Sequence, residues 1–148
     1  MISDTHGLLR PQAISSLEGA QLIVHAGDVG DPQILSQLRS IAPTTAVRGN
    51  IDTGAWAASL PMTEVVEIGD VHLYVLHDLA ALDLDPKAAG FAAVISGHTH
   101  RPAAQLRNEV LYLNPGSAGP RRFKLPIAVA RLEIVGDRLT HEIIELVE

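Results

Sequence analysis

Residues 97–100 read Gly97-His98-Thr99-His100, and the rest of the chain is best understood from this motif. It directly follows the apolar run at 92–96, which is typical of a buried strand, and its glycine permits a sharp turn as the backbone leaves that strand. We therefore expect the two imidazole rings to be presented together. Imidazole is the commonest side-chain ligand for a transition metal, but neighbouring histidines also occur in ordinary loops. The remaining sequence has to supply further ligands if this is a metal site.

The composition indicates one globular domain that spans residues 1–148. The chain has 148 residues, of which 47% are hydrophobic, so it can bury a core without disulfides. Cysteine is absent, which excludes disulfides, thiolate ligands and cysteine nucleophiles.

Charge and hydropathy limit the partners. A formal net charge of -6 argues against duplex nucleic acid, because neutralising phosphates needs clustered lysine and arginine. No apolar run approaches the roughly 20 residues of a membrane span and no signal peptide is visible, so we expect a soluble cytoplasmic protein. The basic cluster Arg121-Arg122-Phe123-Lys124 is expected to be a solvated loop, with phosphate contact or a subunit interface as alternatives. The assembly state is left open, with a homodimer or a homotetramer as candidates.

The first half of the chain alternates between strands and helices. Hydrophobic pattern and capping residues predict a strand stub at 1–3, a helix at 8–17, a strand at 21–26, a helix that opens at Asp31-Pro32, and a strand at 44–47. In one sheet this order requires parallel strands with right-handed crossovers, so the carboxyl ends of the strands lie along one edge. Open α/β sheets place their ligands at that edge.

The second half is expected to consist mostly of strands. A hairpin is predicted at 63–68 and 71–76 around Gly69-Asp70, followed by a short helix at 86–90 and by strands at 92–96, 103–107, 110–113, 127–135 and 139–146. The predicted fold class is therefore α/β, with two packed mixed β-sheets flanked by helices in an α/β/β/α sandwich.

Polar residues that bind metals follow five separate apolar strands. These residues are Asp4, His6, Asp28, Asn50, His77, His98 and His100. Glycine directly precedes Asp28, Asn50 and His98, which allows the backbone to approach a site closely. Independent loops would rarely coincide in this way, so we interpret the strand ends as one site.

The combined motifs resemble those of the calcineurin-like metallophosphoesterase superfamily, specifically its small prokaryotic phosphodiesterase branch. The matching pieces are Asp4-Thr5-His6, Gly27-Asp28, Gly49-Asn50-Ile51-Asp52, His77, Gly97-His98-Thr99-His100 and Asn114-Pro115-Gly116-Ser117. The resemblance spans nearly the whole chain, and it implies the metallophosphoesterase fold.

The resemblance also implies two divalent metal ions that share Asp28. Asp4, His6 and His100 would complete one site, and Asn50, His77 and His98 the other; Asp28, Asn50 and His98 would be catalytic. The donor set contains no sulfur and suits Mn, Fe, Co, Ni or Zn better than Ca. Manganese is the expectation from the family.

The implied activity is hydrolysis of a small phosphate diester by a hydroxide that bridges the two ions, without a covalent phospho-enzyme. Two alternatives remain. A eukaryotic trafficking subunit with this fold serves as an interaction scaffold, and other superfamily members are monoesterases or nucleotidases. Because every ligand position is filled by a competent residue, the enzyme is favoured over the scaffold.

Two positions depart from the family pattern. Many members carry a histidine that protonates the leaving oxygen where this chain has Ile51, which favours substrates with a good leaving group. Asp52 is retained, with a role that reduces to holding the loop. Asp78 follows His77 where the family usually has glycine.

The remaining candidates have structural interpretations. His25 is expected to be a packed or supporting ring rather than a ligand, His72 to be structural, and His141 to lie on the surface. The stretch Asn114-Pro115-Gly116-Ser117 is expected to line the site, with a plain turn as the alternative.

The start of the chain carries a further expectation. Only Met1-Ile2-Ser3 precedes Asp4, whereas strands usually run about 5–6 residues and the family enters this motif through a longer apolar strand. We therefore expect Met1 to be a late start, and about four upstream apolar residues to raise the melting temperature and the metal affinity.

Overall fold

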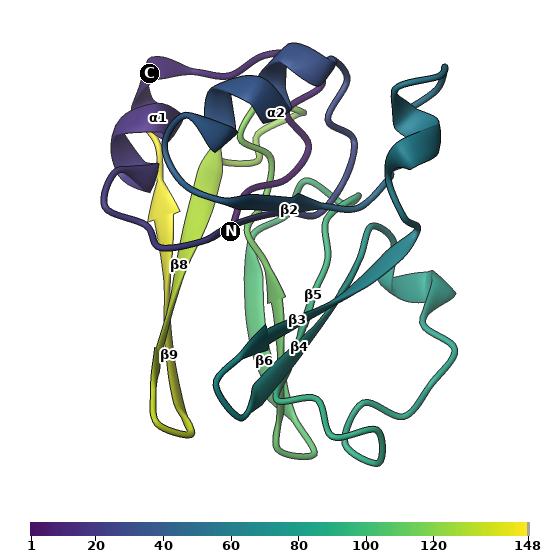
Figure 1. Cartoon of the computed structure of the whole chain (residues 1–148). Coiled ribbons are helices and arrows are strands. Elements are labelled where there is room, and N and C mark those ends of the chain that lie inside the picture. The colour runs from purple at the N-terminus through teal and green to yellow at the C-terminus, as the bar shows by residue number, and fades with distance from the viewer. Residues whose placement is uncertain (148) are drawn as a thin grey trace.

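The computed structural model describes residues 1–147, whose strands form a parallel pair, a mixed five-stranded sheet and an antiparallel pair. Figure 1 shows the helices α1 and α2 at the top of the view, opposite the hairpin turns at the bottom. The first sheet contains β1 (Ile23–His25) and β2 (Thr44–Ala46), which pair in parallel. Ile2 adds a parallel bridge to His25. Two crossovers join these segments, through α1 (Pro11–Leu17) and α2 (Pro32–Arg39), as the sequence predicted.

The start of the chain connects this pair to a long hairpin. Met1 and Ala130 exchange backbone hydrogen bonds of 2.8 and 2.9 Å. Ala130 belongs to β8 (Ala128–Val135), which pairs antiparallel with β9 (Arg138–Glu145). The segment that leads to Asp4 therefore lies in the middle of the first layer.

The second sheet is mixed and has the strand order β3-β4-β5-β7-β6. Its strands are β3 (Thr63–Ile68), β4 (Val71–Leu76), β5 (Ala93–Ile95), β6 (Ala103–Arg107) and β7 (Val110–Asn114). The three central strands β4, β5 and β7 run parallel to one another. Their carboxyl ends consequently lie at one edge, next to the carboxyl ends of β1 and β2.

Three apolar clusters hold the layers together. One joins the helices to the outer face of the first sheet, through residues such as Leu35, Leu38 and Ile23. A second fills the space between the sheets, with Val24 on one side and Leu73 and Ile95 on the other. The two-sheet sandwich predicted from the sequence is confirmed, and its core explains why these central strands read as continuous apolar runs.

The outer face of the second sheet differs in detail from the prediction. The segment at 86–90 was predicted to be a short helix, but it forms consecutive turns. Apolar side chains around it, including Leu82, Leu84 and Phe91, pack against the sheet. Two short 3₁₀ helices, η1 (Ala57–Ser59) and η2 (Leu79–Ala81), had not been predicted.

The helices of residues 1–147 are all short, since the longest, α2, has 8 residues, and none is suited to crossing a bilayer. Helix α2 begins as predicted. The Asp31 carboxylate accepts a hydrogen bond of 2.9 Å from the amide of Gln33, and Pro32 occupies the first turn.

Candidate metal centre

The structure brings all seven predicted ligand residues to one edge of the two sheets. Asp4 and His6 follow the first extended segment, Asp28 follows β1, and Asn50 follows β2. His77 follows β4, while His98 and His100 follow β5. The site is therefore built from both layers, and its geometry depends on how the sheets are packed.

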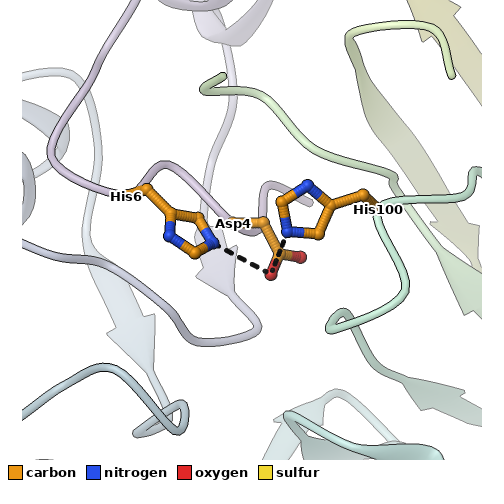
Figure 2. A group of neighbouring side chains, drawn as sticks. All are labelled: Asp4, His6 and His100. Atoms are coloured by element: carbon orange, nitrogen blue, oxygen red, sulfur yellow. Dashed lines mark ion pairs between the residues drawn. The ribbon is translucent and has the colours of Figure 1, made fainter. Parts of the chain in front are cut away.

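The first group consists of Asp4, His6 and His100 (Figure 2). Oδ1 of Asp4 lies 3.8 Å from Nε2 of His6 and 3.4 Å from Nε2 of His100. The Asp4 side chain is fully buried and that of His100 is only 1% exposed, so these donors face one another away from solvent.

The second group consists of Asp28, His77 and His98, whose candidate ligand atoms lie within 4.8 Å of one another. Asn50 belongs to it as well. Its Oδ1 lies 3.0 Å from Nε2 of His77 and 3.3 Å from Nδ1 of His98. His77 holds its ring with Nδ1, which donates to the Ala26 carbonyl at 2.8 Å, so Nε2 faces the site.

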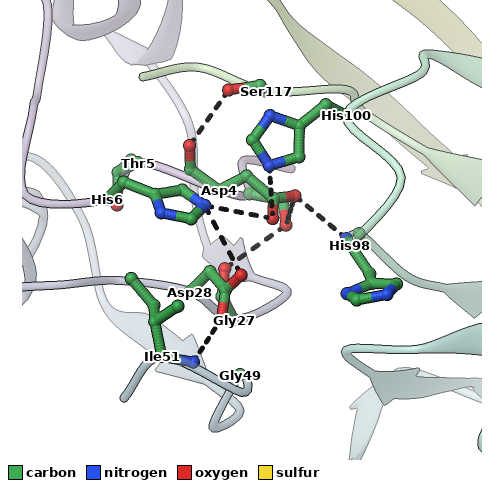
Figure 3. Close-up of polar contacts among 12 residues, drawn as sticks. Asp4, Thr5, His6, Gly27, Asp28, Gly49, Ile51, His98, His100 and Ser117 are labelled. Atoms are coloured by element: carbon green, nitrogen blue, oxygen red, sulfur yellow. Dashed lines mark hydrogen bonds and ion pairs between the residues drawn. The ribbon is translucent and has the colours of Figure 1, made fainter. Parts of the chain in front are cut away.

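Asp28 links the two groups. Its Oδ2 lies 3.4 Å from Nε2 of His6 and 3.2 Å from Nε2 of His77. Its Oδ1 is held separately, by a hydrogen bond of 3.0 Å from the amide of Ile51 (Figure 3). One carboxylate oxygen of Asp28 therefore stands between a histidine of each group.

Asp4 is anchored in the same way. Its Oδ2 accepts hydrogen bonds from the Ser3 hydroxyl at 2.7 Å and from the His98 amide at 3.1 Å. Its Oδ1 and Nε2 of His6 are buried and have no hydrogen-bond partner. Each of the two carboxylates thus keeps one oxygen fixed by the protein and directs the other into the site.

These distances fit metal ions. Donor atoms that each lie about 2.1 Å from one ion are separated by roughly 3.0–3.4 Å. Nε2 of His6 lies 3.8 Å from Oδ1 of Asp4 and 3.4 Å from Oδ2 of Asp28, in or just beyond this range. Both distances exceed the length of a hydrogen bond. Buried donors that face one another at this spacing without a hydrogen bond are costly unless a cation lies between them. The set of carboxylate, amide and imidazole donors suits a divalent transition metal.

The backbone at the site is strained. Five of the candidate ligand residues adopt the left-handed conformation, with φ of 55° at Asp4, 47° at His6, 56° at Asp28, 72° at His98 and 61° at His100. Non-glycine residues rarely adopt this conformation, which costs about 1–2 kcal/mol per residue. Clustering of such residues is typical of functional sites, where the surrounding fold maintains the strain.

The three predicted glycines are required for close approach. A Cβ atom at Gly49 would collide with the carboxylate and amide of Asp28, and one at Gly97 would collide with the Ser3 hydroxyl. At Gly27, where φ is +99°, a Cβ atom would lie 2.7 Å from Nδ1 of His77. The prediction that glycine lets the backbone approach the site is confirmed at all three positions.

Asp52 holds the two loops of the second group together. Its carboxylate accepts hydrogen bonds from the amides of Val29 at 3.2 Å, Gly30 at 2.9 Å and Gly49 at 2.9 Å. It is 4% exposed. Asp52 therefore connects the Asp28 loop to the Asn50 loop, in agreement with the loop-holding role expected for it.

His25 supports the site from within the core, as expected. Its Nδ1 accepts a hydrogen bond of 3.1 Å from the Gly27 amide, which leaves the proton on Nε2, 3.0 Å from the Thr5 hydroxyl. That hydroxyl donates to the Val29 carbonyl. Burial lowers the pKa of His25 to about 3, so the ring is neutral. This chain of hydrogen bonds fixes the loops that carry Asp4 and Asp28.

The Asn114–Ser117 stretch also contacts the ligand loops. The Asn114 amide donates to the Gly97 carbonyl at 2.9 Å and to the Thr99 hydroxyl at 3.1 Å. The Ser117 hydroxyl lies 3.0 Å from the Asp4 carbonyl. The partners of Asn114 and Ser117 could not be predicted from the sequence alone, because these hydrogen bonds join segments more than ten residues apart in the chain.

The other singled-out residues lie farther out. Arg121, Arg122 and Lys124 are exposed. His72 is half-exposed beside Glu67, and His141 is exposed on β9. Two cavities, of about 380 and 640 Å³, are lined by none of the seven candidate ligand residues.

The two carboxylates have opposite electrostatic environments. Burial raises the pKa of Asp4, against the hydrogen bond from Ser3. Burial acts in the same direction on Asp28, but hydrogen bonds from His77 and from the Ile51 amide outweigh it and hold the pKa of Asp28 below its usual value. Asp28 is therefore ionised at neutral pH and can bind cations.

The two buried imidazoles also differ. Burial opposes the charge of His77, but the Asp28 carboxylate and the Ala26 carbonyl outweigh it and raise the pKa of His77 above its usual value. Burial, with the charge of Arg122, lowers the pKa of His100 to about 4. His100 is consequently neutral and available as a ligand, whereas His77 shares a proton with Asp28 in the absence of metal.

The comparison with protein families agrees with this geometry. A model of the calcineurin-like phosphoesterase superfamily domain matches residues 1–137. The chain belongs to this superfamily. The family predicted from the strand-end motifs is therefore confirmed.

Individual relatives support the assignment. The chain is 35% identical over 161 residues to a probable metallophosphoesterase of Methanocaldococcus jannaschii, covering 100% of this chain and 81% of the relative. It is 28% identical to phosphodiesterase YfcE of Escherichia coli, over 78% of this chain and 76% of that one.

Solved structures confirm the fold. An archaeal phosphodiesterase superposes with a TM-score of 0.79 at 22% identity, covering 97% of both chains. Vps29 of Chaetomium thermophilum superposes with a TM-score of 0.79 at 19% identity, covering 97% of this chain and 94% of that one. At these identities the likeness concerns the fold alone.

The raised pKa of His77 predicts that metal binding releases a proton at neutral pH. That proton lies among oxygens of Asp28 and Asn50, where it competes with a metal ion. Because the pKa of His77 is raised above its usual value, metal affinity should keep rising as the pH increases through the neutral range. The lowered pKa of His100, about 4, makes its contribution appear only at acidic pH.

Calorimetric titration with Mn²⁺ at pH 6 to 8, in buffers of different ionisation enthalpy, measures the released protons. When the wild-type chain binds Mn²⁺, it should release a fraction of a proton, and this fraction should grow as the pH is lowered. His77→Ala should lose this proton release, whereas His141→Ala should keep it. Equal release in the His77→Ala variant would contradict the assignment.

Proposed function

We propose that residues 1–148 form a single metal-dependent phosphodiesterase domain with a dinuclear centre. Asp4, His6, Asp28 and His100 would hold one ion, and Asp28, Asn50, His77 and His98 the other. The proposal rests on the position of Asp28 Oδ2, which lies 3.4 Å from Nε2 of His6 and 3.2 Å from Nε2 of His77. Manganese is the expected metal, and a cytoplasmic location stays a prediction.

Two such ions supply an activated water at neutral pH and stabilise the negative charge that develops on the phosphate. The protein contributes rigid placement of the donors. Backbone amides fix one oxygen of Asp4 and one of Asp28, while Asp52, His25 and Asn114 hold the loops. Preorganisation of this kind keeps the donors in place without reorganisation during the reaction.

The substrate is expected to approach on the side of His98 and Ile51. The side chain of His98 is 43% exposed and Ile51 is 40% exposed, whereas Asp4, Asp28, His77 and His100 are buried. Ile51 has no proton to donate, and its amide is already bound to Asp28. A leaving group on the side of His98 and Ile51 must depart as a stable anion or take its proton from water.

The diester assignment is supported by a relative named as a phosphodiesterase, YfcE of Escherichia coli. A scaffold function is the second candidate, because Vps29 has the same fold. The buried, partnerless donors Asp4 Oδ1 and His6 Nε2 favour the enzyme, since a scaffold gains nothing from maintaining them. A monoesterase or nucleotidase would use the same donors and differs only in the substrate.

Replacing Asp28 tests the shared ligand. Asp28→Ala should remove most of the bound metal and lower diesterase activity by at least about 100-fold, because even residues that only support a ligand cost 10–100-fold. His141→Ala, on the exposed surface of β9, should change neither quantity. Elemental analysis and hydrolysis of an aryl phosphate diester measure the two effects. Asp28→Ala with wild-type metal content and activity would contradict the proposal.

Replacing Ile51 tests the missing acid. Rates on a series of aryl diesters should fall steeply as the leaving phenol becomes more basic. Ile51→His should flatten that slope and raise the rate for the most basic phenol by about 10-fold, because a positioned acid assists poor leaving groups most. Val65→His, at a similarly exposed apolar position in β3, is the control. A shallow slope in the wild-type enzyme would mean that another group donates the proton.

A further inference from the structure

His98 is the most exposed of the candidate histidine ligands, and its ring lies between the site and a carboxylate outside it. Nδ1 of His98 lies 3.3 Å from Oδ1 of Asn50, on the inner side. Nε2 lies 3.9 Å from Oδ2 of Asp78, on the outer side. The side chains of His98 and Asp78 are 43% and 46% exposed, so packing does little to hold this ring.

Asp78 is itself oriented by the backbone. Its Oδ1 accepts a hydrogen bond of 3.0 Å from the Ala80 amide and caps the 3₁₀ helix η2. This bond leaves Oδ2 directed toward His98. Asp78 also follows His77 directly in the chain, so one short segment carries a ligand and a carboxylate that faces the neighbouring ligand.

The two imidazoles of this group show the same arrangement. His77 places its outer nitrogen, Nδ1, 2.8 Å from the Ala26 carbonyl, so Nε2 faces the site. His98 places its outer nitrogen, Nε2, toward Asp78, so Nδ1 faces the site. A metal-binding histidine generally donates its other N–H to a carboxylate or carbonyl, which fixes the tautomer and the ring orientation.

We propose that Asp78 is a positioning residue that holds His98 as the Nε2-protonated tautomer, with the lone pair of Nδ1 directed at the metal. This inference rests on the proposed dinuclear centre and adds a residue to it. The pair is separated by 3.9 Å, and an approach of about 1 Å brings it to hydrogen-bond distance. The alternative is that Asp78 only caps η2.

Asparagine separates the two roles. Asp78→Asn keeps a good capping residue but removes the carboxylate, and Asp78→Glu restores a carboxylate with a longer side chain. The matched control is Asp85→Asn. Asp85 caps a turn through the amides of Lys87 at 3.1 Å and Ala88 at 3.4 Å, and neither of these is a candidate ligand residue.

The experiment titrates the chelator-stripped full chain with Mn²⁺ by calorimetry. Asp78→Asn should weaken the binding of one ion by about 10-fold or more and leave the other within about 2-fold, because supporting residues act on the ligand that they orient. Asp78→Glu should recover part of the loss, and Asp85→Asn should match the wild type. The melting temperature of the stripped chain should be the same in all variants.

A second measurement separates orientation from a simple charge effect. In the zinc-loaded chain, long-range ¹H–¹⁵N correlation should show His98 protonated at Nε2, and Asp78→Asn should produce a mixture of tautomers. The ratio of wild-type to variant affinity should persist at 1 M salt, where exposed charges about 4 Å or more apart are largely screened.

Equal affinities for both ions in Asp78→Asn and wild type would overturn the inference, as would a ratio that disappears in high salt. If the wild type binds one ion only, the dinuclear centre and this inference both fail. If two ions bind and Asp78→Asn weakens one, but no phosphate diester is hydrolysed, the inference holds and the proposed function fails.

Discussion

The carboxylate of Asp28 is the contact on which both halves of the site depend. One oxygen is fixed by the Ile51 amide, and the other stands between His6 and His77. This position requires a left-handed backbone at Asp28 and a neighbouring Gly49 without a side chain. Both features lower the stability of the folded chain, and the hydrogen bonds that Asp52 accepts offset this cost. The loop is thus held in a costly conformation that serves ligand placement.

The two-layer fold explains how this contact is maintained. His6 and Asp28 come from the first sheet, whereas His77, His98 and His100 come from the second. The apolar cluster between the sheets fixes their separation, because close-packed cores resist displacement. A hydrogen bond from the Ser117 hydroxyl to the Asp4 carbonyl joins the layers again at the site itself, while Asn114 donates to the Gly97 carbonyl within the second layer.

Much of this arrangement is predictable because its signals are local. Gly69-Asp70 determines the hairpin, whose strands have the predicted bounds, and apolar runs that end in Asp, Asn or His mark the candidate ligands. The turns at 86–90 carry helix-like signals, a proline at the start and a glycine at the end, but the segment is held instead by side chains such as Leu84 and Phe91. The contact between Asp78 and His98 joins residues twenty positions apart and leaves no local pattern.

The most direct test of the dinuclear centre is a crystal structure of the chain grown with Mn²⁺, with anomalous scattering used to locate the metal. We expect two peaks for each chain, about 3.5–4 Å apart, with Asp28 bound to both. Asp4, His6 and His100 should surround one peak, and Asn50, His77 and His98 the other. A single peak, or a pair in which Asp28 binds only one ion, would contradict this expectation.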